Sequence, residues 1–423
     1  MNKLLVAILG AAGIAFIGGL STNNTVQACG DYGVFDRVVE KAAPVKEVND
    51  KIDTNAEHKV PADSKPVLIE EKAAAKPKVQ LAILLDTSGS MDGLIDQART
   101  QLWTIVNEFA FMKRAGQEPE LEVALYEYGN SSIAADEGYI RQVLAFTMDL
   151  DKVSEELFKL TTNGGSEFCG HVIKSAVEGL KWSDVADDYK AIFIAGNEPF
   201  TQGSVDFKES CKAAITKDVI VNTIHCGGFQ DGIDGKWQEG AQLADGTYLS
   251  IDHNAKVVHI ASPHDEEILK TGEEINKTYI RYGNAGGEGA ARQEEQDKNA
   301  DGAGQGADVN RALWKSKNQY RNDDWDLIDA IDNETVKLAD IKKEDLPEEL
   351  RKLSDEDLKK HIDAKRAERA ELKKKLLELE TKRNNHVAEE RRKLAEKGEE
   401  TLDAAVLKAV REQAAKRKFE RSS

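Results

Sequence analysis

Asp86, Ser88 and Ser90 place side-chain oxygens at every second position, a pattern suited to binding a metal ion. They alternate within the stretch 79–91, Val-Gln-Leu-Ala-Ile-Leu-Leu-Asp-Thr-Ser-Gly-Ser-Met. Carboxylate and hydroxyl oxygens are hard ligands that suit small divalent ions. The pattern therefore predicts a metal-ligating turn, with Mg²⁺ or Mn²⁺ as the expected ion and Ca²⁺ as the alternative.

Two later segments carry oxygens that could complete such a site. A Thr-Asn-Gly-Gly-Ser-Glu segment ends in Ser166 and Glu167, and its glycines allow the tight backbone that brings a side chain to an ion. An Ala-Gly-Asn-Glu-Pro segment carries Asn197 and Glu198. We expect Ser166 and Glu198 to join the metal ligands, with Asn197 and Glu167 as alternative donors.

The elements that must position these residues are strands alternating with helices. The continuous apolar run before Asp86 is typical of a buried central strand of a parallel sheet. Further strand and helix patterns alternate over residues 78–283, which predicts an α/β fold with a doubly wound, mainly parallel sheet and helices on both faces. Ligands of such sheets bind outside the carboxyl ends of the strands, where the Asp86 turn falls.

An Asp-x-Ser-x-Ser turn after a buried strand, followed by a Gly-Gly-Ser loop, resembles the metal-ion-dependent adhesion site of the von Willebrand factor type A family. The resemblance covers residues 78–283. It implies a Mg²⁺ site in which Ser88 and Ser90 bind the ion, Asp86 binds it directly or through water, and Ser166 adds a hydroxyl. It also implies one open position for a carboxylate of a partner protein. The family usually has an Asp where this chain has Gly196, and losing that carboxylate weakens the field at the ion.

Charge and motifs narrow the classes of function. The 423 residues include 76 Asp and Glu against 58 Lys and Arg, a net charge of −18, which argues against nucleic acid as a partner. The sequence has no Gly-x-Ser-x-Gly elbow, no phosphate-binding Gly-x-x-x-x-Gly-Lys loop and no His-Glu-x-x-His motif. We therefore expect a protein that is not an enzyme. The resemblance implies that it binds a protein ligand with an exposed Asp or Glu.

The first residues of the chain carry a targeting pattern. Residues 1–28 combine a basic start, an apolar run and a final Val-Gln-Ala, which predicts a signal peptide and export to the periplasm or cell envelope. Cleavage there would leave Cys29 first, and its lipidation is the alternative to a soluble exported protein. Residues 29–77 are rich in Ala, Lys, Glu, Asp and Pro, which predicts a flexible linker.

Export would place the remaining cysteines in an oxidising compartment, where disulfides persist. Among Cys169, Cys211 and Cys226 we favour a Cys211–Cys226 bridge, although spacing alone does not fix the pairing. Zinc held by Cys169, His171, His225 and Cys226 is the alternative, but the spacing fits no usual zinc module.

The rest of the chain predicts a linker and then helices. Residues 284–310 are rich in Gly, Ala, Gln and Asp, which favours a linker. Residues 311–423 read as an α-helical region with a weak coiled-coil seam, more typical of an antiparallel hairpin than of a long zipper, and able to form a homodimer. The alternative function is accordingly a structural or assembly factor of the cell envelope that acts through this helical tail, with a degenerate metal site.

Overall fold

The structure, a computed structural model, describes residues 76–92, 95, 104–106, 108–109, 111–251, 260–303, 306–395 and 402–421. The predicted signal peptide, Cys29 and nearly all of the predicted linker over 29–77 lie outside the described residues. Within the described ranges, no helix combines the length and the apolar character needed to cross a membrane.

A six-stranded sheet forms the centre of the α/β domain. Its strands follow the order β4-β3-β1-β5-β6-β7, and each neighbouring pair is parallel except β3 with β4. The strands span Lys78–Asp86 (β1), Glu120–Tyr128 (β3), Ile140–Thr147 (β4), Tyr189–Gly196 (β5), Ile220–His225 (β6) and Tyr248–Ser250 (β7). The predicted doubly wound, mainly parallel fold is therefore confirmed.

The strand order reverses next to β1. Strands β3 and β4 are added on one side of β1, and β5, β6 and β7 on the other. The loops that leave β1 and β5 therefore diverge at the carboxyl edge of the sheet, and such a switch point is where open α/β sheets bind ligands. The Asp86 turn lies directly at this point.

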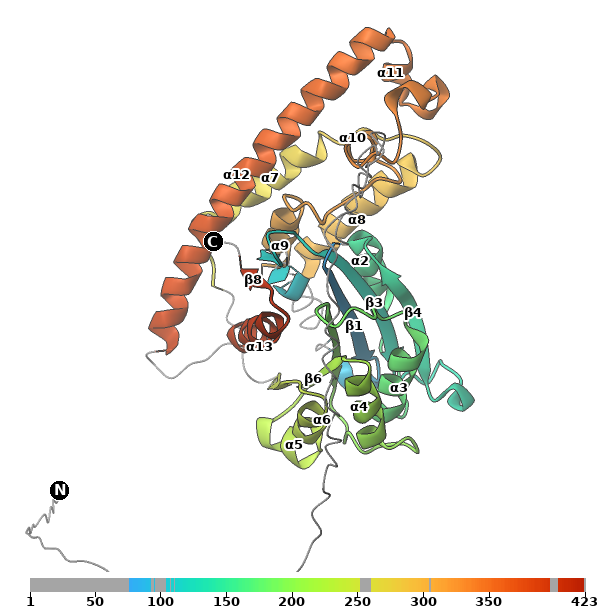
Figure 1. Cartoon of the computed structure of the whole chain (residues 1–423), viewed down its shortest axis with the longest axis vertical. Coiled ribbons are helices and arrows are strands. Elements are labelled where there is room, and N and C mark those ends of the chain that lie inside the picture. Colours follow the sequence, from blue (N-terminus) through green and yellow to red (C-terminus); the bar gives the residue numbers. More distant parts are fainter. Residues whose placement is uncertain are drawn as a thin grey trace, which may run out of the picture. The chain divides into compact units, whose positions relative to one another are not determined.

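Alternate side chains of β1 enter two separate cores, because successive residues of a strand face opposite sides of the sheet. Leu81 and Leu85 belong to one core, and Ala82 and Leu84 to the other. Figure 1 shows helices α3, α4 and α6 on one side of the sheet and α13 on the other. The helices of the α/β part span Leu150–Lys159 (α2), Cys169–Gly179 (α3), Phe207–Thr216 (α4), Phe229–Asp234 (α5) and Trp237–Leu243 (α6).

The cysteines of the described ranges are buried and free. Cys211 lies on α4 in the core on one face of the sheet, whereas Cys226 follows β6 and belongs to the core on the other face. The predicted Cys211–Cys226 bridge is therefore wrong, because the sheet separates the two sulfur atoms. Across the described residues, no group of three or more His, Cys, Asp or Glu side chains is placed to hold an ion, so the zinc alternative finds no support either.

Residues 284–310 differ from their prediction. Most of them form helix α8, whose Gln296 accepts a hydrogen bond from the Ser154 hydroxyl of α2 at 2.8 Å. Gly289 lets this helix approach Trp325, since an added Cβ would lie 2.2 Å from the indole ring. The helices after the sheet span Asp265–Asn276 (α7), Gly286–Ala303 (α8), Ala307–Trp314 (α9), Leu327–Asp332 (α10), Glu348–Arg351 (α11), Asp355–Ala395 (α12) and Leu402–Lys416 (α13).

The apolar seam of α12 is used inside the chain. Leu376 and Leu379 are buried in one cluster with Ile268 of α7 and Leu313 of α9. The long helix therefore packs along α7 (Figure 1). The predicted homodimer remains a prediction.

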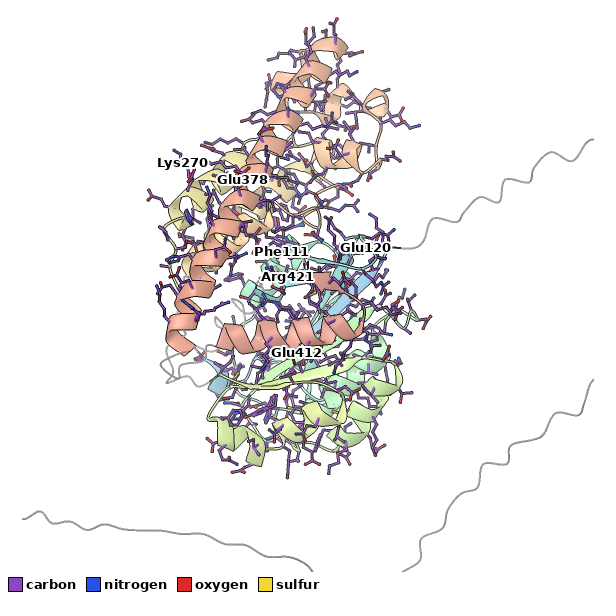
Figure 2. The ribbon with its side chains drawn as sticks, turned by 60° about the vertical axis from the view of Figure 1, so that its left-hand side comes forward. Phe111, Glu120, Lys270, Glu378, Glu412 and Arg421 are labelled. Carbon is purple, nitrogen blue, oxygen red and sulfur yellow. The ribbon has the colours of Figure 1, made fainter. Side chains whose placement is uncertain are left out.

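The last helix is part of the sheet's own core. Val406 and Val410 of α13 are buried with residues of the central strands. Gln413 receives a hydrogen bond from the Tyr189 hydroxyl of β5 at 2.8 Å and donates one to Asn222 Oδ1 of β6 at 2.7 Å. Figure 2 shows α13 and the short strand after it, whose Arg421 lies over the ring of Phe111, 4.6 Å from its centre. That strand, Glu420–Arg421 (β8), pairs antiparallel with Met112–Lys113 (β2).

Candidate functional site

The turn after β1 brings together the three residues singled out first. Asp86 is fully buried, and its Oδ1 accepts a hydrogen bond from the Ser88 backbone N–H at 2.7 Å. The Ser88 and Ser90 hydroxyl oxygens lie 2.9 Å apart, with Ser88 buried and Ser90 exposed. The turn thus combines a buried carboxylate, Asp86, with the hydroxyls of buried Ser88 and exposed Ser90.

The second loop lies against this turn, as the sequence predicts. The Asn163 N–H donates to the Thr87 carbonyl at 2.9 Å, and a Cβ added at Gly89 would lie 3.6 Å from the Gly164 nitrogen. Ser166, the predicted ligand of this loop, is half-buried.

Glu167, next to Ser166, is the residue of this loop that reaches the Asp86 carboxyl. A Cβ added at Gly129 would lie 2.7 Å from Asp86 Oδ1 and 2.8 Å from Glu167 Cγ, so the two side chains flank the same glycine. Gly129 also has φ of +80°, a backbone conformation that favours glycine. The sequence named Glu167 only as an alternative donor.

The third loop, after β5, contributes an amide and not the usual carboxylate. The Ser90 hydroxyl donates to Asn197 Oδ1 at 3.1 Å. Glu198 is half-buried, and its backbone carbonyl accepts from Trp237 Nε1 at 2.9 Å. The negative charge of Glu198 contributes to the raised pKa of Glu167, after burial and Asp86. Its carboxylate therefore lies near the site, behind Glu167.

The buried carboxyl groups of Asp86 and Glu167 affect each other's pKa. Burial, followed by the negative charge of Asp86, raises the pKa of Glu167 to about 9. Burial also raises the pKa of Asp86. At neutral pH and without a cation, Glu167 therefore holds a proton.

The donor set fits a hard divalent ion. Asp86 Oδ2 and Glu167 Oε2 are buried and have no hydrogen-bond partner among the described residues. Together with the Ser88 and Ser90 hydroxyls, these two carboxyl oxygens are an all-oxygen donor set of the kind that suits such an ion.

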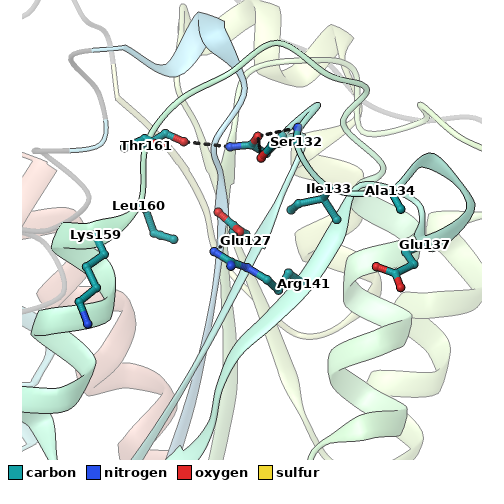
Figure 3. A pocket seen from close by; sticks show the side chains of 10 residues that line it. Glu127, Ser132, Ile133, Ala134, Glu137, Arg141, Lys159, Leu160 and Thr161 are labelled. Atoms are coloured by element: carbon teal, nitrogen blue, oxygen red, sulfur yellow. Dashed lines mark hydrogen bonds and ion pairs between the residues drawn. The ribbon is translucent and has the colours of Figure 1, made fainter.

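A polar pocket of about 300 Å³ adjoins the turn (Figure 3). Glu127 forms an ion pair with Arg141 at 2.5 Å on its floor and accepts a hydrogen bond from the Thr87 hydroxyl of the turn at 3.4 Å. The pocket is lined by Glu127, Asn130, Ser132, Ile133, Ala134, Glu137, Arg141, Lys159, Leu160 and Thr161. No sequence pattern predicts it, because these residues come from separate segments that only the fold brings together.

Comparison with known proteins finds likeness in solved structures only. No family model matches the chain, and no curated protein matches it in sequence. The chain is similar to the VWA domain of SpRpn10, with 17% identity and a TM-score of 0.34, over 42% of this chain and 90% of that one. It is similar to the conserved hypothetical protein BatB from Bacteroides thetaiotaomicron, with 18% identity and a TM-score of 0.32, over 41% of this chain and 90% of that one.

A third similar structure is proximal thread matrix protein 1 from the mussel byssus, whose MIDAS motif is occupied by zinc. It shares 9% identity with this chain at a TM-score of 0.30, over 41% of this chain and 42% of that one. Likenesses of this strength carry no argument about function, which we base on the geometry of the strand ends.

Proposed function

We propose that the α/β domain of this chain, which is von Willebrand A-like, is a protein-interaction module that holds a carboxylate of its partner through a divalent cation. One observation carries the proposal: the orphaned oxygens of Asp86 and Glu167 lie beside two serine hydroxyls at the switch point of the sheet. A bound cation would allow both adjacent buried carboxyls to ionise, which is costly without a compensating positive charge.

The protein leaves room for an outside ligand. Asp86, Ser88 and Ser90 would hold the ion together with a group from the second loop, whereas Mg²⁺ takes six oxygens in near-octahedral geometry. Ser90, Gly164 and Gly165 are exposed, so the ion would be reached from this side. The bound ion would supply a positive charge, and the partner's Asp or Glu would complete its coordination.

Binding fits the described side chains better than catalysis. Burial raises the pKa of Cys169, Cys226 and Cys211, in the last case to about 12, so each of these thiols stays protonated and is a poor nucleophile at neutral pH. Burial lowers the pKa of His225. We therefore propose that the protein is not an enzyme.

The proposed place of action is the cell envelope. The basic start, apolar run and Val-Gln-Ala end of residues 1–28 support export, and Cys29 offers a lipid anchor. A domain held outside the cytoplasm in this way would meet the surface carboxylates of other envelope proteins.

Loss of the metal ligands should abolish partner capture. We expect Asp86→Ala and Ser88→Ala each to lower capture of envelope proteins at least about tenfold, because outer-shell changes alone cost a metal site that much. The measurement is capture by the immobilised full chain with Mg²⁺ and with EDTA, and EDTA should reproduce both variants.

Ser204→Ala, which alters an exposed serine away from the turn, serves as the matched control and should capture as the wild type does. Capture that is equal with Mg²⁺, with EDTA and in both turn variants would reject the metal-dependent mechanism.

The helical tail gives the alternative, an assembly factor of the envelope with a vestigial metal site. Much of the tail is already engaged, since Val410 and Gln413 of α13 pack on the sheet and Leu376 of α12 on α7. Leu377 remains 43% exposed on α12 as a point of contact for a partner. This alternative predicts no affinity for Mg²⁺ or Mn²⁺.

A further inference from the structure

We infer that Glu167 is the second carboxylate ligand of the cation, and that it replaces a carboxylate that position 196 has no room to supply. This inference rests on the cation binding proposed above and goes further by assigning the residue that sets the charge of the site. The site would then hold its ion with two carboxylates, Asp86 and Glu167, from two different loops.

Position 196 is closed to any side chain. A Cβ added at Gly196 would lie 2.4 Å from the Tyr128 hydroxyl oxygen and 3.1 Å from both Asp86 Oδ2 and the Trp237 ring. Tyr128 is fully buried, and its hydroxyl donates to the Ala195 carbonyl at 2.9 Å, so it is held in place. The tyrosine therefore occupies the room through which an Asp at this position would reach the ion.

The structure holds the Glu167 carboxyl beside Asp86, in the site that receives no carboxylate from position 196. Only 4% of Glu167 is exposed, and its backbone N–H donates to Gln202 Oε1 at 2.5 Å, which fixes the start of the chain into α3. Its Cγ lies over Gly129 next to Asp86 Oδ1, because neither side chain meets a Cβ there. The carboxyl is thus delivered beside Asp86 at Gly129, directly after β3.

Asp86 and Glu167 each have a buried carboxyl oxygen that a cation between them could contact. Asp86 is fully buried and Glu167 nearly so, and each has one buried oxygen without a hydrogen-bond partner in the described part of the chain. Two adjacent buried carboxyls repel each other when both are ionised, and either a proton shared between them or a cation relieves this repulsion. A cation between the two would pair both oxygens at once.

Glu198 is the other carboxylate that could serve as the second ligand of the cation, but its position is less suited to this role. It is half-buried, and its backbone carbonyl accepts a hydrogen bond from Trp237 Nε1. Asn197, next to it, already reaches the Ser90 hydroxyl through its amide oxygen. The third loop therefore contributes an amide contact, and the second loop contributes the charge.

The test is Mn²⁺ binding to the full-length chain, measured by calorimetric titration and by the electron paramagnetic resonance signal of the ion. We expect Glu167→Gln to weaken Mn²⁺ binding at least about tenfold and Glu198→Gln to weaken it less. Glu178→Gln, which alters an exposed glutamate of α3, is the matched control and should leave binding within about twofold. Glu167→Asp keeps the charge but withdraws it by one methylene group, so it should bind with intermediate affinity. If Glu167→Gln fails to fold, the Mn²⁺ affinity of Glu167→Asp tests the assignment instead.

The outcomes separate this inference from the proposed function. Wild-type protein that binds no Mn²⁺ would overturn both. Wild-type protein that binds Mn²⁺ while both Glu167 variants bind equally well would overturn only the assignment of Glu167. Loss of binding in Glu198→Gln, with Glu167→Gln unaffected, would assign the second carboxylate to the third loop instead.

Discussion

Replacing Arg369 with methionine is expected to lower the free energy of unfolding by about 3–5 kcal/mol, the usual cost of removing one partner from a buried ion pair. Arg369 lies on α12 with its side chain 4% exposed. Its Nη1 contacts Asp326 Oδ2 at 2.7 Å and Asp329 Oδ1 at 2.8 Å, and its Nε donates to the Thr278 hydroxyl at 2.9 Å. Methionine would fill much of the volume but remove the guanidinium that contacts both buried carboxylates, leaving them with the charge of the nearby Lys373.

The carboxylates cannot easily move away to water. Asp326 also accepts hydrogen bonds from the backbone N–H groups of Ile280 at 2.7 Å and Asp329 at 2.9 Å, so it stays anchored in the core. Burial and the neighbouring Asp326 raise the pKa of Asp329 to about 6 even with Arg369 present. Removing the guanidinium would also end its stacking on the Tyr279 ring, whose centre is 4.1 Å away.

Urea unfolding followed by circular dichroism measures this effect. The matched control is Arg366→Met on the same helix, because Arg366 pairs with Asp332 and Asp363 at the surface and should change stability by only about 0.5 kcal/mol. A loss below about 1 kcal/mol for Arg369→Met would show that the network does not fix α12 to the layer beneath it.

In the presence of a chelator, the protein is expected to lose stability as the pH rises from 4.5 towards about 9. The pKa of Glu167 is raised in the folded state, from 4.5 to about 9, by burial and by the charge of Asp86. The folded state therefore binds the proton more tightly than the unfolded chain. Its stabilising contribution is complete below the unfolded pKa and is lost as the pH passes through the folded pKa, with a slope of at most about 1.4 kcal/mol per pH unit.

The difference between wild type and Glu167→Gln reports on Glu167 together with Asp86, which interacts with it, since residues elsewhere titrate in both proteins. The glutamine side chain cannot ionise, so its unfolding free energy should depend less on pH over this range. Saturating Mg²⁺ should also flatten the wild-type curve, because a cation stabilises the ionised carboxyl. Identical slopes in EDTA for the two proteins would contradict the raised pKa.

The elements that carry a strong pattern could be predicted. The apolar run into Asp86 indicated both the central strand and the edge on which the site lies, and the structure places the strand end and both loops there. Helix α8 was missed because Gly, Ala and Gln give it no apolar periodicity; it is stabilised instead by buried amides such as Gln296, which bonds to α2. The Cys211–Cys226 pairing failed because spacing does not say which face of the sheet each thiol occupies.

The sequence alone could not show which of the candidate residues reach the site. Ser166 and Glu167 are neighbours with suitable oxygens, and the choice between them depends on how the loop passes Gly129. The absence of a side chain at Gly196 has its cause in Tyr128, on a strand far away in the chain. The covering of the sheet by α13 likewise depends on Gln413, which meets β5 and β6 across some two hundred residues.

The most direct test of the central claim is an anomalous difference map from crystals of the full chain grown at saturating Mn²⁺. We expect one peak at the carboxyl edge of the sheet. Oxygens of Asp86, Ser88, Ser90 and Glu167 should lie at about 2.1 Å from it or be bridged to it by water. Well-ordered density for these side chains without a cation among them would contradict it.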